Sequence, residues 1–148
     1  MRRAARGFTL IELLIVVAVI AIIMGMGLPN LLNAKRAANE ASAIASLRGI
    51  CSACEQYRVS ADPRSYPADL AALTIAGGAP MDFIDARLAS GVKSDYVFNL
   101  AGAGTTWQAW AAPLSLAGGG RAFYTDQTGV IRQVAGLGPA GAADAPLD

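Results

Sequence analysis

One carboxylate, Glu12, lies inside an otherwise apolar segment near the start of the chain. The segment covers residues 8–28, and Arg2, Arg3 and Arg6 precede it. At about 1.5 Å per residue, a helix of this length is about 30 Å long, which is the thickness of the hydrocarbon core of a bilayer. The pattern predicts a membrane-spanning helix. Because a charged group is costly to place in such a helix, Glu12 is a candidate functional residue that requires a partner.

Two cysteines form the second group that could do chemistry. Cys51 and Cys54 are three residues apart in a predicted helix and therefore share a face. They lie in the middle of the helix, whereas a redox pair works best at a helix N-terminus, where the dipole lowers the thiol pKa. The position favours a packed structural pair, with or without a disulfide between the two, over a redox site. Two cysteines without any histidine cannot complete a tetrahedral metal site, so we expect no metal or cofactor.

The remaining carboxylates do not predict an enzyme. Asp82 and Asp85 could share a helical face, and Asp126 lies near Thr128, but no base, nucleophile and oxyanion donor come together in the sequence. Carboxylates at turns are more often caps and turn formers than ligands. The Asp126 turn has too few acidic residues to predict a calcium site well. The formal net charge of +1 gives no basic surface, so we expect no general nucleic-acid binding.

The helix that carries these residues should extend beyond the apolar segment to about residue 59. Its second half, residues 29–59, is amphipathic, because apolar side chains recur at three- and four-residue spacing. Proline in a helix interior removes a hydrogen bond, so Pro29 should mark a kink or a weak point. The apolar positions of the second half are Ile44, Leu47, Ile50 or Cys51, Cys54 and Tyr57.

Residues 60–135 predict one small globular domain. A turn-rich loop with short helices over 67–73 and 82–89 comes first. The period of the sequence then changes to two, which predicts four strands that form an antiparallel sheet. We therefore expect an α+β fold, with the amphipathic half of the long helix packed on one face of the sheet. The predicted strands cover residues 95–100, 106–112, 122–125 and 129–134, and the tail, residues 136–148, is expected to be disordered.

Two local features of the predicted sheet are specific. Residues 126–129 have the composition of a hairpin turn in which Gly129 takes a positive φ. Trp107 and Trp110 are three residues apart in one strand and therefore point to opposite faces. One of them should be buried, and the other should be exposed or contact another subunit.

The order of parts over residues 6–32 resembles the class III signal peptide of type IV pilins and their relatives. The resemblance implies that residues 1–7 are a leader, which prepilin peptidase removes after Gly7, and that Phe8 becomes a methylated N-terminus. A secretory signal peptide would be cut behind its apolar stretch and would lose it. Here the apolar segment 8–28 is kept as the transmembrane and assembly helix. The pilin fold, a long helix packed on an antiparallel sheet, agrees with the fold expected from the sequence pattern.

The resemblance also implies roles for two helix residues. Glu12 would attract the N-terminal amine of Phe8 on a neighbouring subunit, and Pro29 would lie where the helix loosens as subunits leave the bilayer. Simpler interpretations stay open for both. Glu12 could reach the membrane surface or pair with the Phe8 amine of its own chain. Pro29 could be a plain kink at the membrane exit.

The function implied by the resemblance is that of a structural subunit of a type IV pilus-like filament. Its partners would be other pilin subunits, the prepilin peptidase and an inner-membrane assembly platform. Before assembly the N-terminus would be cytoplasmic and the rest would lie outside the inner membrane. After assembly the subunit would be in a surface pilus or a periplasmic pseudopilus. The alternatives are a type II secretion pseudopilin, a minor tip or priming subunit and, from another class, a monomeric membrane-anchored binding domain.

Overall fold

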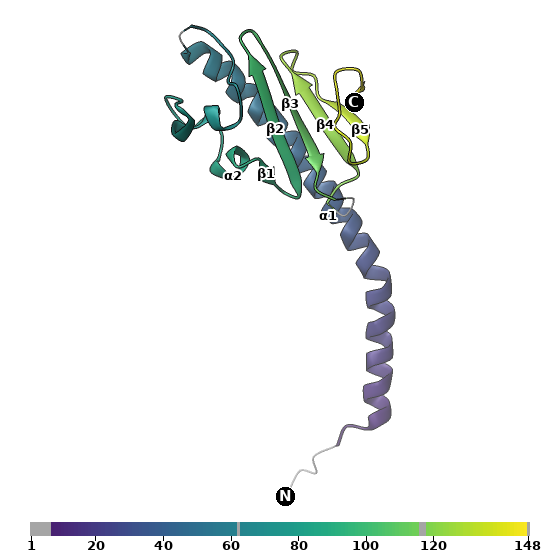
Figure 1. Ribbon diagram of the computed structural model, residues 1–148. Helices are drawn as coiled ribbons and strands as arrows, with labels where there is room; N and C mark the ends of the chain where they lie inside the picture. Colours follow the sequence, from purple (N-terminus) through teal and green to yellow (C-terminus); the bar gives the residue numbers. More distant parts are fainter. Residues whose placement is uncertain (1–6, 62, 116–117, 148) are drawn as a thin grey trace, which may run out of the picture. The chain divides into compact units, whose positions relative to one another are not determined.

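A single long helix runs through both of the compact units into which the chain divides. The computed structural model describes residues 7–61, 63–115 and 118–147, so the first six residues of the predicted leader lie outside the described part. The two units are Met1–Ala34 and Lys35–Asp148, and we call the second unit the head. The helix, α1, covers Leu10–Ser60, which confirms the prediction of one helix that ends near residue 59 (Figure 1).

The head contains an antiparallel sheet whose strands follow one another in chain order, from β1 to β6. This confirms the α+β fold, with six strands in place of the four that the sequence predicts. The two additional strands, β1 and β6, have two residues each, which is too short for an alternating pattern to be visible in the sequence. The strands are β1 (Val92–Lys93), β2 (Tyr96–Ala103), β3 (Thr106–Pro113), β4 (Arg121–Asp126), β5 (Arg132–Ala135) and β6 (Ala145–Pro146).

Short helical turns occupy the connection between α1 and the sheet. They are the 3-10 helices η1 (Ala71–Leu73) and η2 (Ile75–Gly77) and the α-helix α2 (Ala86–Ala89). Both helical regions are shorter than the sequence predicts. In the second region the reason is a cap, because the Asp85 side chain accepts a hydrogen bond from the Leu88 N–H at 2.8 Å, which places the helix start after Asp85.

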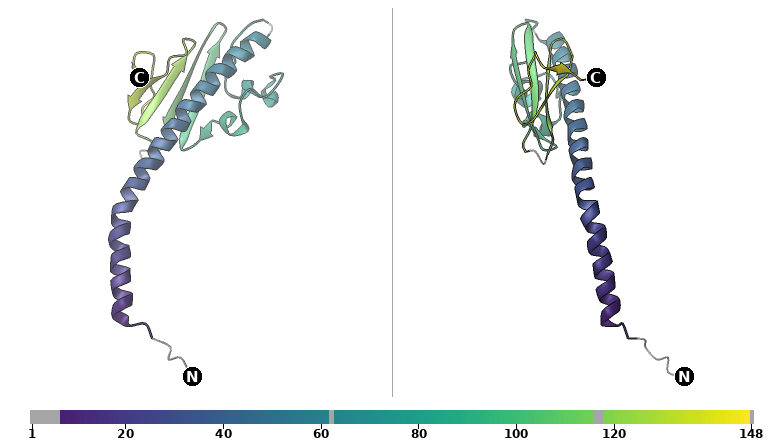
Figure 2. Two further views of the ribbon diagram at one scale, coloured as in Figure 1. Left: turned by 180° about the vertical axis from the view of Figure 1, so that it is seen from behind. Right: turned by 90° about the vertical axis from the view of Figure 1, so that its right-hand side faces the viewer.

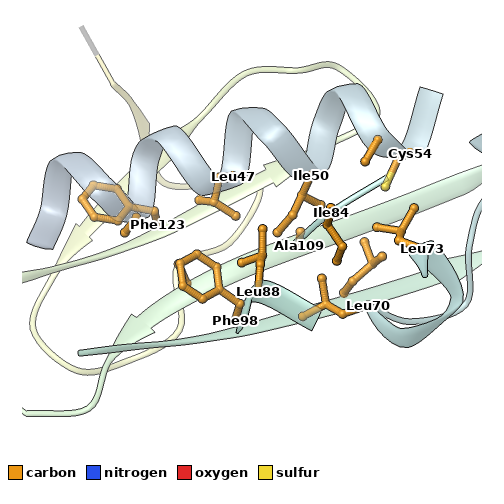
Figure 3. Packing of buried hydrophobic residues seen from close by; sticks show 14 of the residues in the cluster. Leu47, Ile50, Cys54, Leu70, Leu73, Ile84, Leu88, Phe98, Ala109 and Phe123 are labelled. Atoms are coloured by element: carbon orange, nitrogen blue, oxygen red, sulfur yellow. The ribbon is translucent and has the colours of Figure 1, made fainter. Parts of the chain in front are cut away.

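The amphipathic half of α1 covers one face of the sheet and forms the main core of the head (Figure 2). Leu47 and Ile50 are fully buried, as their spacing predicts. They point toward Phe98 of β2 and Phe123 of β4, which face α1 across the layer (Figure 3). Other buried members of this core are Ala43, Cys54, Leu70, Leu73, Ile84, Leu88, Leu100, Trp107 and Ala109.

The tail is ordered against the sheet, contrary to the disorder that its composition predicts. Strand β6 pairs with β5, and the Leu147 N–H donates to the Ile131 carbonyl oxygen at 2.7 Å. Ala140 is buried against Ala122 and Tyr124 on the face of the sheet away from α1. A glycine- and alanine-rich segment has no side-chain period to read, but the backbone groups along the open edge of β5 give it hydrogen-bond partners.

The two cysteines are free thiols on the side of α1 that packs against the core of the head. Cys54 is fully buried in the core, and Cys51 is half-buried beside it. The structure therefore has the packed pair, without the disulfide that the sequence left open. Burial raises the pKa of Cys54 to about 12, and burial also raises the pKa of Cys51. Both thiols are protonated at neutral pH, which does not favour redox chemistry.

An ion pair also joins α1 to the sheet. The Glu40 carboxylate lies 2.6 Å from the Arg121 guanidinium and accepts a hydrogen bond from the Gly120 N–H at 2.9 Å. The Glu40 side chain is only 13% exposed. Burial opposes its ionisation, but the hydrogen bonds and the charge of Arg121 outweigh burial and hold the pKa of Glu40 below its usual range.

The buried thiol predicts a stability effect. Replacing both Cys51 and Cys54 by alanine should lower the free energy of unfolding by about 1–3 kcal/mol, because the change leaves a small cavity in the core. Urea unfolding of the detergent-solubilised chain, followed by tryptophan fluorescence, measures this. Cys51→Ala alone is the control and should lose less, since Cys51 is half-buried. A double variant as stable as the parent would contradict the packing argument.

The Glu40–Arg121 pair predicts an acid-sensitive component of stability. The pKa of Glu40 is lowered in the folded protein, so its contribution is fully present above the unfolded pKa of about 4.3 and is lost as the pH falls through the folded value. Glu40→Gln should cost about 1 kcal/mol at pH 7 and make unfolding less dependent on pH below about 4.3. Urea midpoints of parent and variant at pH 7, 5, 4 and 3 test this. If the urea midpoint of the variant fell with pH as steeply as that of the parent, the prediction would be contradicted.

Candidate assembly site at the start of the long helix

Glu12 and Thr9 cap the N-terminus of α1 together. The Thr9 N–H donates to Glu12 Oε2 at 2.9 Å, and the Thr9 hydroxyl donates to the same oxygen at 2.6 Å. In return, the Glu12 N–H donates to Thr9 Oγ1 at 3.3 Å. This reciprocal arrangement is a capping box, in which the residue before the helix and the third helical residue satisfy backbone N–H groups that have no partner within the helix.

The carboxylate keeps capacity for another partner. A carboxylate has two oxygens with about four lone-pair sites, and the Thr9 donors both reach Oε2. The Glu12 side chain is exposed in the single chain, as is Phe8, which is 73% exposed. The site can therefore accept a cation at Glu12 without giving up its cap.

Apart from Thr9, the side chains near Glu12 along the helix are apolar. Large side chains such as Leu10, Ile11, Leu13 and Leu14 are all more than half exposed. Within the described residues, α1 is the one helix long and apolar enough to cross a membrane, and its most apolar window has a mean hydropathy of 2.8 with no part buried. Such a surface in a single chain requires lipid or other helices to cover it.

Pro29 lies within α1, with helical residues on both sides. Its side chain is exposed. Proline donates no backbone hydrogen bond, so one link of the helix is missing at this point. That the helix is weak at Pro29 stays a prediction, and the missing backbone hydrogen bond is its basis.

The other candidate residues belong to the head and have structural partners. Asp85 caps α2 and pairs with Lys93 at 2.8 Å, and the Asp82 carboxylate accepts from the Ile75 N–H at 2.8 Å. Asp126 accepts from the N–H and the hydroxyl of Thr128 in the turn after β4. In the described part of the chain, no three histidine, cysteine or acidic residues form a group that could hold a metal ion.

Thr9 is the functional residue that the sequence analysis does not identify. Its signal is present, because threonine followed by glutamate three positions later, ahead of an apolar run, is the pattern of a capping box. The structure adds a partner on the same chain, three residues away.

Comparisons with known proteins concern the same end of the chain. Residues 2–28 match the family described as the prokaryotic N-terminal methylation motif. The type IV wide pilus major component of Thermus thermophilus is 45% identical over 75 residues, which cover 51% of this chain and 56% of that protein. The type II secretion system core protein G of Pectobacterium carotovorum is 27% identical over 85 residues, which cover 43% of this chain and 54% of that protein.

The chain spans about half the length of the curated relatives that it matches. No solved structure matches it. The methylation motif covers Gly7, Phe8 and Glu12, and both relatives are components of filament or secretion systems by name. The apolar start of α1 lies within this motif. Residues 2–28 therefore carry the prokaryotic N-terminal methylation motif, and the chain is similar to a type IV pilus component and to a type II secretion core protein.

Proposed function

We propose that the chain is a structural subunit of a type IV pilus-like filament. The observation that carries the proposal is one ionisable residue, Glu12, at the start of a helix whose apolar surface is exposed on all sides. In a filament, the helices of neighbouring subunits would cover this surface. The similarity to a major pilus component supports a pilus subunit, and the similarity to a type II secretion core protein supports a pseudopilin as the second candidate.

Processing prepares the helix for assembly in this proposal. The prepilin peptidase cleaves between Gly7 and Phe8, and Phe8 is methylated at its new amine. The subunit waits in the inner membrane with its N-terminus in the cytoplasm, and the assembly platform transfers it to the filament. The arginines at positions 2, 3 and 6 support this orientation, because basic residues favour the cytoplasmic side.

Glu12 would then select the position of the incoming helix. Its carboxylate attracts the Phe8 amine of a neighbouring subunit, and methylation leaves that amine cationic. In the apolar centre of a bundle an unpaired carboxylate is costly, so pairing fixes the axial register between helices. A monomeric membrane-anchored binding domain, the alternative from another class, needs neither this carboxylate nor the Gly7–Phe8 junction.

The first prediction of this proposal concerns processing. The mature chain should begin at Phe8, because Gly7 has no side chain to obstruct the peptidase and every later cut would remove part of the apolar helix. Intact mass of the membrane-extracted protein, with one added methyl group at Phe8, tests the prediction. Recovery of a chain that begins beyond Leu28 would contradict it.

The second prediction separates the charge of Glu12 from its cap. Glu12→Gln removes the charge but keeps an acceptor for Thr9, since glutamine also serves in a capping box. The variant should be inserted and cleaved normally, yet its amount in sheared surface filaments should fall at least about tenfold, as the loss of a buried ion pair of a few kcal/mol implies. Immunoblots of surface and whole-cell fractions measure this.

Thr9→Val provides the matched control for this variant. It removes the hydroxyl that donates to Glu12 but keeps the carboxylate, so it should assemble much better than Glu12→Gln. If cleaved Glu12→Gln protein reached the surface in the same amount as the parent, the charge of Glu12 would not be needed for assembly. Glu12 would then act only within its own chain. A loss of assembly in Thr9→Val as severe as in Glu12→Gln would assign the effect to the cap.

A further inference from the structure

The first two turns of α1 in the head are fastened to the sheet by polar contacts. Lys35 Nζ lies 3.1 Å from Asp95 Oδ2. The Asn39 amide donates to the same carboxylate oxygen at 3.1 Å and to the Gly118 carbonyl oxygen at 2.9 Å. These residues tie the helix to the turn between β1 and β2 and to the connection between β3 and β4.

Two further contacts strengthen the attachment. The Ser42 hydroxyl lies 2.9 Å from the Ser94 hydroxyl, within hydrogen-bond distance. The Glu40 ion pair with Arg121 belongs to the same stretch of α1. We call the helix residues Lys35, Asn39, Glu40 and Ser42, with their partners on the sheet, the polar clamp.

The turn that receives the clamp has an unfavourable backbone conformation. Ser94 and Asp95 have φ values of 52° and 60°, and they link Lys93 to Tyr96, which pair with each other across the hairpin. Such two-residue turns usually contain glycine or asparagine, because other residues seldom adopt positive φ. Residues in such conformations persist where the surroundings hold them, and here both side chains contact α1.

Further along the helix, buried apolar side chains replace these polar contacts. Among the described residues of the head, the first fully buried side chain of α1 is Ala43, and the first large one is Leu47. Residues 35–42 are exposed or half-buried. This stretch is therefore held by side-chain hydrogen bonds and ion pairs, whereas the residues from 43 onward are held by the apolar core.

We infer that the polar clamp is the stop at which loosening of α1 ends. Helical segments without tertiary support open at low free energy, and opening spreads until side chains are fixed. Pro29, six residues before Lys35, lacks a backbone hydrogen bond and is a place where opening can begin. The clamp stops the opening ahead of the apolar stripe and so protects the core. This role does not depend on whether the chain forms a pilus or a pseudopilus.

Hydrogen exchange on the full chain in detergent micelles tests the inference with Asp95→Gly. Glycine suits the positive φ of the turn, so the variant removes the contacts to Lys35 and Asn39 without straining the hairpin. Amide exchange in residues 35–43 should become about tenfold faster, as the loss of hydrogen bonds to a charged group implies. Exchange in residues 47–57 and the urea midpoint should stay at the parental values.

Two control variants separate the clamp from general destabilisation. Asp95→Asn keeps an acceptor for the Asn39 amide and should change exchange less than Asp95→Gly. Lys93→Gln breaks the ion pair to Asp85 close to the same turn, an ion pair that includes no residue of α1, and should leave exchange in residues 35–43 unchanged. If Asp95→Gly lowers the urea midpoint, Asn39→Ala repeats the comparison from the helix side and should accelerate residues 35–43 alone.

Either of two results would overturn the inference. Unchanged exchange in residues 35–43 of both Asp95→Gly and Asn39→Ala would show that the helix holds there without the contacts of Lys35 and Asn39 to the sheet. An equal acceleration in residues 35–43 and 47–57, together with a lower urea midpoint, would show that the contacts only contribute to global stability.

Discussion

A single continuous helix of 51 residues must satisfy two different surroundings, and the rest of the structure depends on this constraint. Its first part is apolar on all sides and needs lipid or other helices. Its second part has one apolar stripe, centred on Leu47, Ile50 and Cys54, that needs a protein layer. The antiparallel sheet supplies that layer, because one face of an amphipathic sheet can be buried while the other meets solvent.

Glu12 is a charged residue in the apolar part of this helix, and its hydrogen bonds make this position less costly. In the single chain its carboxylate already receives two hydrogen bonds from Thr9. These hydrogen bonds lower the cost of placing the carboxylate in apolar surroundings. In the proposed filament a neighbouring amine would add a charge partner to a carboxylate that is already oriented, and less side-chain entropy would be lost on pairing.

The features that could be predicted from the sequence are those with a local signal. The helical period identified Leu47 and Ile50 as core, and the turn composition located Gly129, which has a φ of 73°. Side chains alternate between the two faces of a strand, which predicts that Trp107 and Trp110 lie on opposite faces. Trp107 is 2% exposed, and Trp110 is partly buried on the other face.

Other features depend on partners that are distant in the sequence. Asn39 meets Asp95 across 56 positions, and nothing in either segment specifies the pairing. The two-residue strands β1 and β6 exist only because a longer strand lies beside each of them, so composition alone predicted a disordered tail. At the candidate site, the T-x-x-E pattern of Thr9 and Glu12 was local and could have been read directly.

The order of the strands has a consequence for how the head forms. Because β1 to β6 lie in the sheet in the order of the chain, each strand pairs with the one made just before it. Pairings between neighbours in the sequence close short loops, which is the least costly kind of closure in chain entropy. A head of this topology can be built strand by strand in the order of the chain, with α1 already in place as the surface on which the sheet grows and β6 as the last step.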